Sequence, residues 1–261
     1  MFLIDIGVNL MNPTFNKDRQ SVIEAAQKAG VKKLLITSID IENSITVAAF
    51  AKDNSCYKAT AGMHPHYARN WNKEAAVQLR ELLPLDAVVA VGECGLDYNR
   101  NYSPPLDQRL CFEEQLALAQ EFQKPVFLHE RDAFDDFYSI LKQYRSRLPG
   151  AVVHCFTGTA SQLDAYLALD CYIGITGWVC DERRGSGLIP LIKQIPADRL
   201  LLETDAPYMF PRNIPYHVKK GRNEPAFLIY IANFIAEITG KEPEQIAEET
   251  SANSERLFAF K

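Results

Sequence analysis

The amino-acid sequence predicts an α/β protein folded as a (β/α)₈ barrel of the TIM type. The chain has eight short apolar runs, and each run leads into a helical or mixed segment. Most of these runs are apolar at consecutive positions, as expected of parallel strands that are covered on both faces. Eight strand–helix units in about 250 residues is the size of one barrel, so we expect a single domain over residues 1–261.

The predicted strands follow one another without a linker, a low-complexity tract or an internal repeat. They are expected at residues 2–9, 33–38, 57–64, 88–95, 125–130, 151–156, 171–176 and 200–205. An open, doubly wound sheet is the rival architecture. That fold needs a glycine-rich phosphate loop after its first strand, and the segment Gly7-Val8-Asn9-Leu10 does not have this pattern.

The segments between the strands carry helix signals. Residues 106–122 follow two prolines and place Phe112, Leu116 and Ala119 at helical spacing. Residues 19–29 end at Gly30, which is a typical C-terminal cap. We expect two further helices to begin near Pro225 and Pro243, because proline is well tolerated in the first helical turn.

Composition excludes several classes of protein. The 28 Lys and Arg against 33 Asp and Glu give a net charge of −5, which argues against nucleic-acid binding through bulk charge but permits local basic patches. We find no signal peptide and no apolar stretch of about 18 residues, so we expect no contact with membranes. Six cysteines form no Cys-x-x-Cys pair, which favours free thiols in a reducing, cytoplasmic location.

Polar residues fall at the ends of the predicted strands, where a barrel gathers its catalytic groups. Four of the five histidines lie there, and an acidic residue ends or nearly ends two more runs. These strand-end residues are His64, His66, Glu93, His129, His154 and Asp205. A single histidine or acid at a strand end is commonly structural, but their joint occurrence predicts a metal-centred site.

The simplest arrangement has Glu93, His129 and His154 holding one divalent ion. Nitrogen and carboxylate ligands suit Zn²⁺, Mn²⁺ or Mg²⁺. Asp205 would then serve as a water ligand or as the general base. Strand alternation predicts that Cys94 and Cys155 point outward into the helix layer, so that no thiolate is required.

Several segments resemble the TatD family of metal-dependent deoxyribonucleases, within the amidohydrolase-like superfamily. They are Gly-Met-His-Pro-His at 62–66, Gly-Glu-Cys-Gly-Leu-Asp at 92–97, Leu-His-Glu-Arg at 128–131, His-Cys-Phe-Thr-Gly at 154–158 and Glu-Thr-Asp-Ala-Pro-Tyr at 203–208. Segments 222–225 and 253–258 are also similar, so the resemblance runs from the first strand to the last helix. Segment 172–185 is most similar to the TatD proteins proper.

The resemblance implies a TIM barrel of the metal-dependent hydrolase type that cleaves DNA phosphodiester bonds. It implies a 3′→5′ exonuclease on single-stranded DNA, and in some members on RNA, with Mg²⁺ as the supporting ion. Glu93, His129, His154 and Asp205 match the family's metal positions, and His64 matches a histidine near the substrate phosphate. We therefore expect Asp205, His64 and Glu93 to be catalytic, and a role in DNA repair or degradation.

One departure from the family concerns the first strand. Most members begin Asp-x-His-x-His, which supplies two ligands of a binuclear centre, whereas this chain reads Asp5-Ile-Gly7-Val-Asn9. TatD proteins proper share this feature. We expect one tightly held ion and a weak second site, to which the Asn9 amide oxygen could contribute. Fewer histidines at the second site favour an oxygen-loving ion such as Mg²⁺.

Basic and aromatic residues on the loops after the strands are the candidate substrate contacts, because arginine suits phosphate oxygens and aromatic rings stack on unpaired bases. The basic candidates are Arg69, Arg100, Arg131, Arg183, Arg184, Arg212, Lys219, Lys220 and Arg222, and the aromatic ones are Tyr98, Trp178, Tyr208 and Phe210. We expect His64, His66, Arg131, Trp178 and Arg222 to bind substrate, and a monomer to be the working state.

Two other functions remain open at this level. A small-molecule amidohydrolase or esterase on the same fold commonly uses His-x-His on strand one and a carbamylated lysine on strand four, and both are absent here. A binding protein that has lost its chemistry is the other alternative. The retained Glu93, His129, His154 and Asp205 argue against it.

Overall fold

A computed structural model describes residues 1–218 and 221–260 of the chain. Its strands form one eight-stranded sheet in the order β1 to β8, and all neighbouring strands are parallel. An isolated parallel bridge between Val8 and Ala206 joins the first strand to the segment that follows the last, so the sheet closes into a barrel. The predicted TIM (β/α)₈ fold is therefore confirmed.

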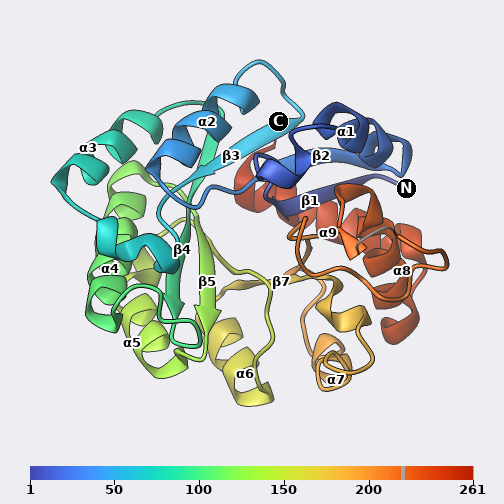
Figure 1. Cartoon of the computed structure of the whole chain (residues 1–261). Coiled ribbons are helices and arrows are strands. Elements are labelled where there is room, and N and C mark those ends of the chain that lie inside the picture. Colours follow the sequence, from blue (N-terminus) through green and yellow to red (C-terminus); the bar gives the residue numbers. More distant parts are fainter. Residues whose placement is uncertain (219–220, 261) are drawn as a thin grey trace.

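All eight predicted strands are present. They are β1 (Leu3–Val8), β2 (Val31–Ile36), β3 (Tyr57–Ala61), β4 (Val88–Asp97), β5 (Val126–Arg131), β6 (Ala151–Val153), β7 (Tyr172–Ile175) and β8 (Leu200–Leu202). The helices of the described residues lie around the outside (Figure 1). They are α1 (Arg19–Lys28), α2 (Ile41–Ala51), α3 (Lys73–Leu82), α4 (Pro105–Phe122), α5 (Phe134–Tyr144), α6 (Ala160–Ala168), α7 (Ile189–Ile192), α8 (Leu228–Thr239) and α9 (Pro243–Phe258).

Several strands end earlier than the apolar pattern predicts. β6 stops at Val153 and β8 stops at Leu202, although the runs continue to residues 156 and 205. The reason is backbone conformation: Cys155 has φ 47° and Asp205 has φ 54°, and these left-handed values are incompatible with a strand. His154 and Asp205 are therefore placed by loops that leave the strands.

Apolar residues fill two layers. The larger cluster lies between the strands and the helices, and contains Leu3 and Val8 of β1. A smaller cluster inside the barrel contains Ile4 and Ile6, which lie on the strand face opposite to Leu3, whereas Val8 at the end of β1 departs from this alternation. The end of the chain joins this inner cluster through Leu257, Phe258 and Phe260. The barrel interior is thus closed by apolar side chains, which leaves its carboxyl end for polar groups.

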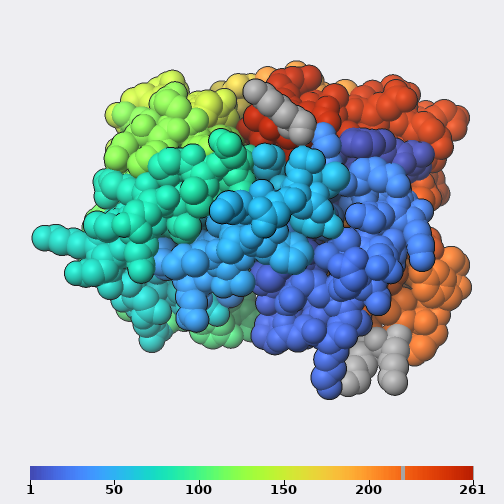
Figure 2. All heavy atoms as spheres, turned by 90° about the horizontal axis from the view of Figure 1, so that it is seen from above, coloured from blue at the N-terminus to red at the C-terminus, as the bar shows by residue number. Residues whose placement is uncertain are grey.

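The two ends of the chain lie side by side. The blue strand β1 is next to the red helices α8 and α9 in Figure 1, and blue atoms of the N-terminal part border red atoms of the C-terminal part on the surface in Figure 2. Ser251 of α9 donates a hydrogen bond to the carbonyl of Phe2 at 3.1 Å.

The predicted glycine at the C-terminal end of the first helix is confirmed, since α1 ends at Lys28 and Gly30 has a left-handed φ of 98°.

Candidate metal centre

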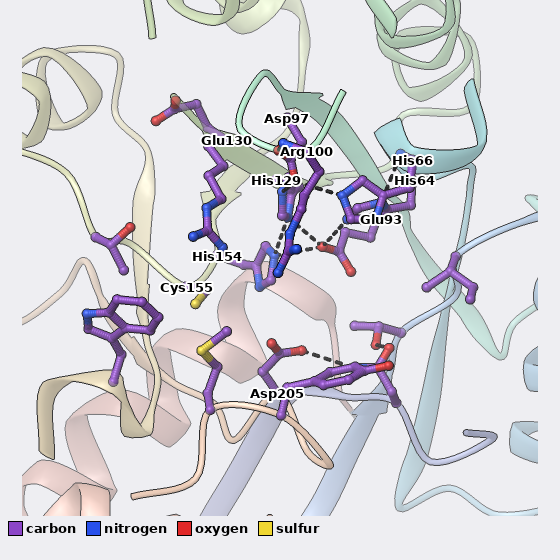
Figure 3. A pocket seen from close by; sticks show the side chains of 18 of the residues that line it. His64, His66, Glu93, Asp97, Arg100, His129, Glu130, His154, Cys155 and Asp205 are labelled. Atoms are coloured by element: carbon purple, nitrogen blue, oxygen red, sulfur yellow. Dashed lines mark hydrogen bonds and ion pairs between the residues drawn. The ribbon is translucent and has the colours of Figure 1, made fainter. Parts of the chain in front are cut away.

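Five predicted residues meet at the carboxyl end of the barrel (Figure 3). His64 follows β3, Glu93 and His129 lie on β4 and β5, His154 follows β6, and Asp205 follows β8. All five line one cavity of about 920 Å³. A cavity of this size is within the range of ligand-binding pockets.

One oxygen of Glu93 is the meeting point of three imidazole rings. Its Oε1 lies 2.8 Å from Nε2 of His154, 2.9 Å from Nδ1 of His129 and 3.3 Å from Nε2 of His64. Nδ1 of His129 is also only 3.3 Å from Nε2 of His154. Two ring nitrogens and a carboxylate oxygen at this separation form a donor set that fits a divalent cation.

Distances alone would place His64 in the ligand set, because donor atoms of His64, Glu93 and His129 lie within 4.8 Å of one another. The hydrogen-bond partner of the second nitrogen in each ring shows whether the first nitrogen can bind a cation or can only donate a hydrogen bond. Nδ1 of His64 accepts a hydrogen bond from the backbone N–H of His66 at 3.1 Å. A neutral His64 therefore carries its proton on Nε2, and that nitrogen can donate but cannot bind a cation.

Two carboxylates that the sequence did not single out lie on the far sides of the His129 and His154 rings. Oδ2 of Asp97 lies 3.4 Å from Nε2 of His129, and Oε2 of Glu203 lies 3.5 Å from Nδ1 of His154. Asp97 accepts the Nε2 proton of His129, and Glu203 is the ion-pair partner on the Nδ1 side of His154. This leaves the lone pairs of Nδ1 of His129 and Nε2 of His154 facing Glu93, as carboxylate–histidine–metal arrangements require.

A signal for both missed residues exists in the sequence. Asp97 is four positions from Glu93 on β4, and residues an even number apart share a strand face. Glu203 is two positions before Asp205 in the predicted last strand. Its fully buried carboxylate also accepts from the backbone N–H of Cys155, and a Cβ at Gly174 would stand 2.6 Å from Oε1. A glycine there makes room for this charge.

The charges of the centre depend on one another. Burial alone would raise the pKa of Glu93, but the rings of His154 and His64 hold that pKa well below its usual value. Burial likewise opposes charge on His154, yet Glu93 and Glu203 raise its pKa well above the usual value. Burial dominates at His64 and lowers its pKa to about 4 despite Glu93, so His64 is neutral at physiological pH.

Asp205 lies at the edge of this group. Its Oδ1 accepts a hydrogen bond from Nδ2 of Asn9 at 2.9 Å, and its backbone N–H donates to the carbonyl of Gly7 at 2.7 Å. Burial raises the pKa of Asp205 to about 8, which His154 partly offsets. Oδ2 of Asp205 has no hydrogen-bond partner among the described residues, so this carboxyl group can exchange a proton with a water in the cavity.

Two expectations need correction. Cys94 belongs to the outer apolar cluster, as predicted, but Cys155 lines the cavity. Strand alternation does not reach Cys155, because β6 has already ended and its φ is 47°. The amide oxygen of Asn9 accepts from the hydroxyl of Thr37 at 3.2 Å and its nitrogen faces Asp205. This orientation does not support the predicted ligand role of Asn9.

The predicted substrate contacts divide into two groups. His66, Arg131 and Trp178 line the cavity, whereas Arg222 is not among its described lining residues. Instead, the Arg222 guanidinium pairs with Asp18 at 2.7 Å and with Glu224 at 2.6 Å. These ion pairs occupy its donors, so we no longer assign Arg222 to substrate binding.

The other candidates divide in the same way. Arg100, Arg184 and Tyr208 line the cavity, and no described carboxylate pairs with either arginine. Arg183 and Arg212 are paired with Asp181. The remaining candidates, Arg69, Tyr98 and Phe210, are not described as lining residues, and Lys219 and Lys220 lie outside the described residues.

Other expectations concern the chain as a whole. All six cysteines are free, as predicted. In the described part of the chain, no helix combines the length and the apolar character needed to cross a membrane.

Comparison with known proteins shows the family of the chain. The family model described as "TatD related DNase" matches residues 4–259. The chain is 50% identical over 260 residues to a protein named 3′-5′ ssDNA/RNA exonuclease TatD from Rahnella sp. (strain Y9602), covering 99% of this chain and 98% of the relative. A protein of the same name from Edwardsiella piscicida is 50% identical over 258 residues, covering 98% and 99%.

Solved structures agree as well. A crystal structure of a TatD homologue from Escherichia coli K12 has a TM-score of 0.89 and 30% identity, with 98% of both chains covered. A TatD family hydrolase from Entamoeba histolytica has a TM-score of 0.87 and 26% identity, with 100% of this chain and 99% of the other covered. The chain belongs to the TatD family of related deoxyribonucleases.

Proposed function

We propose that the chain is a metal-dependent 3′-5′ exonuclease that hydrolyses phosphodiester bonds of single-stranded DNA, and of RNA. The observation that carries this function is the convergence of His129, His154 and Glu93 beside Asp205 at the mouth of the barrel. The identity of 50% to named exonucleases over nearly the whole chain supports the substrate class.

A divalent ion fits the donor set of Glu93, His129 and His154. When bound, such an ion polarises a phosphoryl oxygen and lowers the pKa of water. We propose Mg²⁺ as the activating ion because the carboxylate of Glu93 suits a hard cation, with Mn²⁺ and Zn²⁺ as the alternatives that the imidazoles favour. We propose one tightly held ion. Two stoichiometric zinc ions after extensive dialysis would contradict this count.

The chain's own groups supply the proton transfers and the orientation. In its ionised form, Asp205 accepts the proton of the attacking water through its free Oδ2. His64 is neutral and carries its proton on Nε2, which faces the centre. It therefore donates a hydrogen bond to a phosphate oxygen of the substrate.

The rim of the cavity fits an unpaired nucleic-acid strand. Arg100, Arg131 and Arg184 present guanidinium groups that no described carboxylate neutralises, which leaves them for phosphates. Trp178 lies under the Arg184 guanidinium, 5.3 Å from ring centroid to carbon, and Tyr102 is 52% exposed beside His66. Trp178 is only partly exposed, whereas an exposed ring such as that of Tyr102 can stack on a base irrespective of sequence.

The test is digestion of end-labelled single- and double-stranded DNA and RNA with a panel of metal ions and a chelator control. We expect stepwise loss from the 3′ end of single strands. Asp205→Asn should abolish cleavage while metal remains bound, and His129→Ala should lose metal and activity together. Cleavage by Asp205→Asn at the wild-type rate with Mg²⁺ present would exclude this mechanism.

A further inference from the structure

Asn9 links Asp205 to Thr37 through the two ends of one amide group. Its nitrogen donates to Oδ1 of Asp205 at 2.9 Å, and its oxygen accepts from the Thr37 hydroxyl at 3.2 Å. In its ionised form the Asp205 carboxylate can only accept hydrogen bonds, and the NH₂ end of the amide faces it. Thr37, which is 3% exposed, fixes the other end. The amide is therefore held by one hydrogen bond at each end.

This orientation leaves Asn9 without an atom for a cation. The amide nitrogen has no available lone pair, and the amide oxygen is directed to the Thr37 hydroxyl. Asp205 has given Oδ1 to the amide, so only Oδ2 remains for a water. Asn9 and Asp205 thus form a hydrogen-bonded pair. The amide N–H occupies the side of the Asp205 carboxylate where a second cation would otherwise balance its charge.

Backbone hydrogen bonds also join the segment around Asn9 to the segment around Asp205. The N–H of Asn9 donates to the carbonyl of Ala206 at 2.8 Å, and the N–H of Asp205 donates to the carbonyl of Gly7 at 2.7 Å. Asp205 has a left-handed φ of 54°, so no regular strand sets the direction of its side chain. The Asn9 amide supplies the directional contact that the strand does not.

We propose that Asn9, held by Thr37, is a positioning residue that fixes Asp205 with Oδ2 free, and that its amide takes the place of a second cation. The amide N–H supplies to Oδ1 the positive partner that a second ion would supply, so the centre works with one ion. This role rests on the proposed function, in which Asp205 accepts a proton from water.

The first test counts ions without substrate. Asn9→Asp keeps the shape of the side chain but sets a second carboxylate against Asp205, and a second cation relieves that repulsion. With Mn²⁺ as the probe, equilibrium dialysis should give one ion per wild-type chain and two per Asn9→Asp chain. Asn12→Asp is the matched control: it adds the same charge three residues away, where Asn12 contacts the Tyr208 hydroxyl. Its count should stay at one.

The second test separates positioning from metal binding. Asn9→Ala should leave the Mn²⁺ count and affinity unchanged, while kcat on single-stranded DNA falls by about 10- to 100-fold and KM changes little. Thr37→Val, which keeps the shape and removes the hydroxyl, should lower kcat less. Lower ion affinity in Asn9→Ala would show that Asn9 is a ligand and overturn the proposal, as would an unchanged kcat or two ions on the wild-type chain.

Failure of the proposed function gives a different result. It would appear as a wild-type protein that cleaves neither DNA nor RNA with any ion. The ion count of Asn9→Asp needs no substrate, so it is read independently of that outcome.

Discussion

Oε2 of Glu203 and Nδ1 of His154 form an ion pair at 3.5 Å, and neither atom has a hydrogen-bond partner among the described residues. Glu203 is fully buried. Burying a carboxylate without a partner costs free energy, so we expect His154 to carry a proton on Nδ1, where it faces the Glu203 charge. In return, Glu203 fixes the tautomer that presents Nε2 of His154 to the ion.

Glu203→Gln tests this relationship. Glutamine keeps the shape and can still accept from the Cys155 N–H, but its NH₂ cannot accept the His154 proton. We expect metal affinity to fall by about 10- to 100-fold, measured by titration calorimetry with Mn²⁺. Asp132→Asn removes a cavity carboxylate that bonds Asn99 and no imidazole, so it controls for charge. Equal affinities in the two variants would contradict the role of Glu203.

Asp97→Asn tests the corresponding role at His129. The carboxylate of Asp97 also accepts from His66 at 2.7 Å, and hydrogen bonds from both rings hold its pKa below the usual value although burial opposes this. Replacement by asparagine should free both rings, weaken metal binding and raise KM for single-stranded DNA. Circular dichroism and thermal melting should show that the barrel is retained. Wild-type metal affinity in this variant would remove Asp97 from the centre.

Separate substitutions of His154 and His64 distinguish a metal ligand from a hydrogen-bond donor to the substrate. His154→Gln should lose the ion, because Nε2 of His154 is one of its ligands. His64→Gln should keep the ion and lose turnover, because the Nε2–H of His64 donates to the substrate. Dialysis with Mn²⁺ and single-turnover cleavage together measure both effects. Loss of the ion in His64→Gln would mean that His64 is a ligand.

Proton release on metal binding follows from the pKa values. Without an ion, burial raises the pKa of Asp205 to about 8, and Glu93 with Glu203 raises that of His154 against burial. Both groups therefore bind protons at pH 7, and a cation has to displace them. We expect metal affinity to increase as pH rises toward 8, with release of about one proton or more per ion. Calorimetry in buffers of different ionisation enthalpy measures this number, and a pH-independent affinity would refute it.

Arginine substitutions test the path of the substrate. Arg184→Ala or Arg131→Ala should raise KM and reduce the salt dependence of binding by about 0.7 in log–log slope per phosphate contact. Arg212→Ala is the control, because its guanidinium already pairs with Glu182 outside the cavity. Arg222→Ala should lower the melting temperature and leave the salt slope unchanged. A change of slope in Arg222→Ala would restore it to the substrate path.

The sequence alone determined the barrel, its eight strands and the residues that gather at its mouth. Apolar runs, glycine caps and strand alternation are local properties, and parallel strands bring their carboxyl ends together whatever the loops contain. This is why His129 and Glu93 could be placed without coordinates. Strand ends were less accurate, because positive φ values at Cys155 and Asp205 depend on their surroundings.

Only the tertiary structure decided which atom of each polar residue faces the centre. The tautomer of His154 depends on Glu203, the amide of Asn9 on Asp205 and Thr37, and the guanidinium of Arg222 on Asp18, 204 positions away. These partners are distant in sequence and are brought together by the closure of the barrel. A hydrogen bond has a direction that residue type and spacing do not encode, and here that direction separates a ligand from a donor and a substrate contact from a structural ion pair.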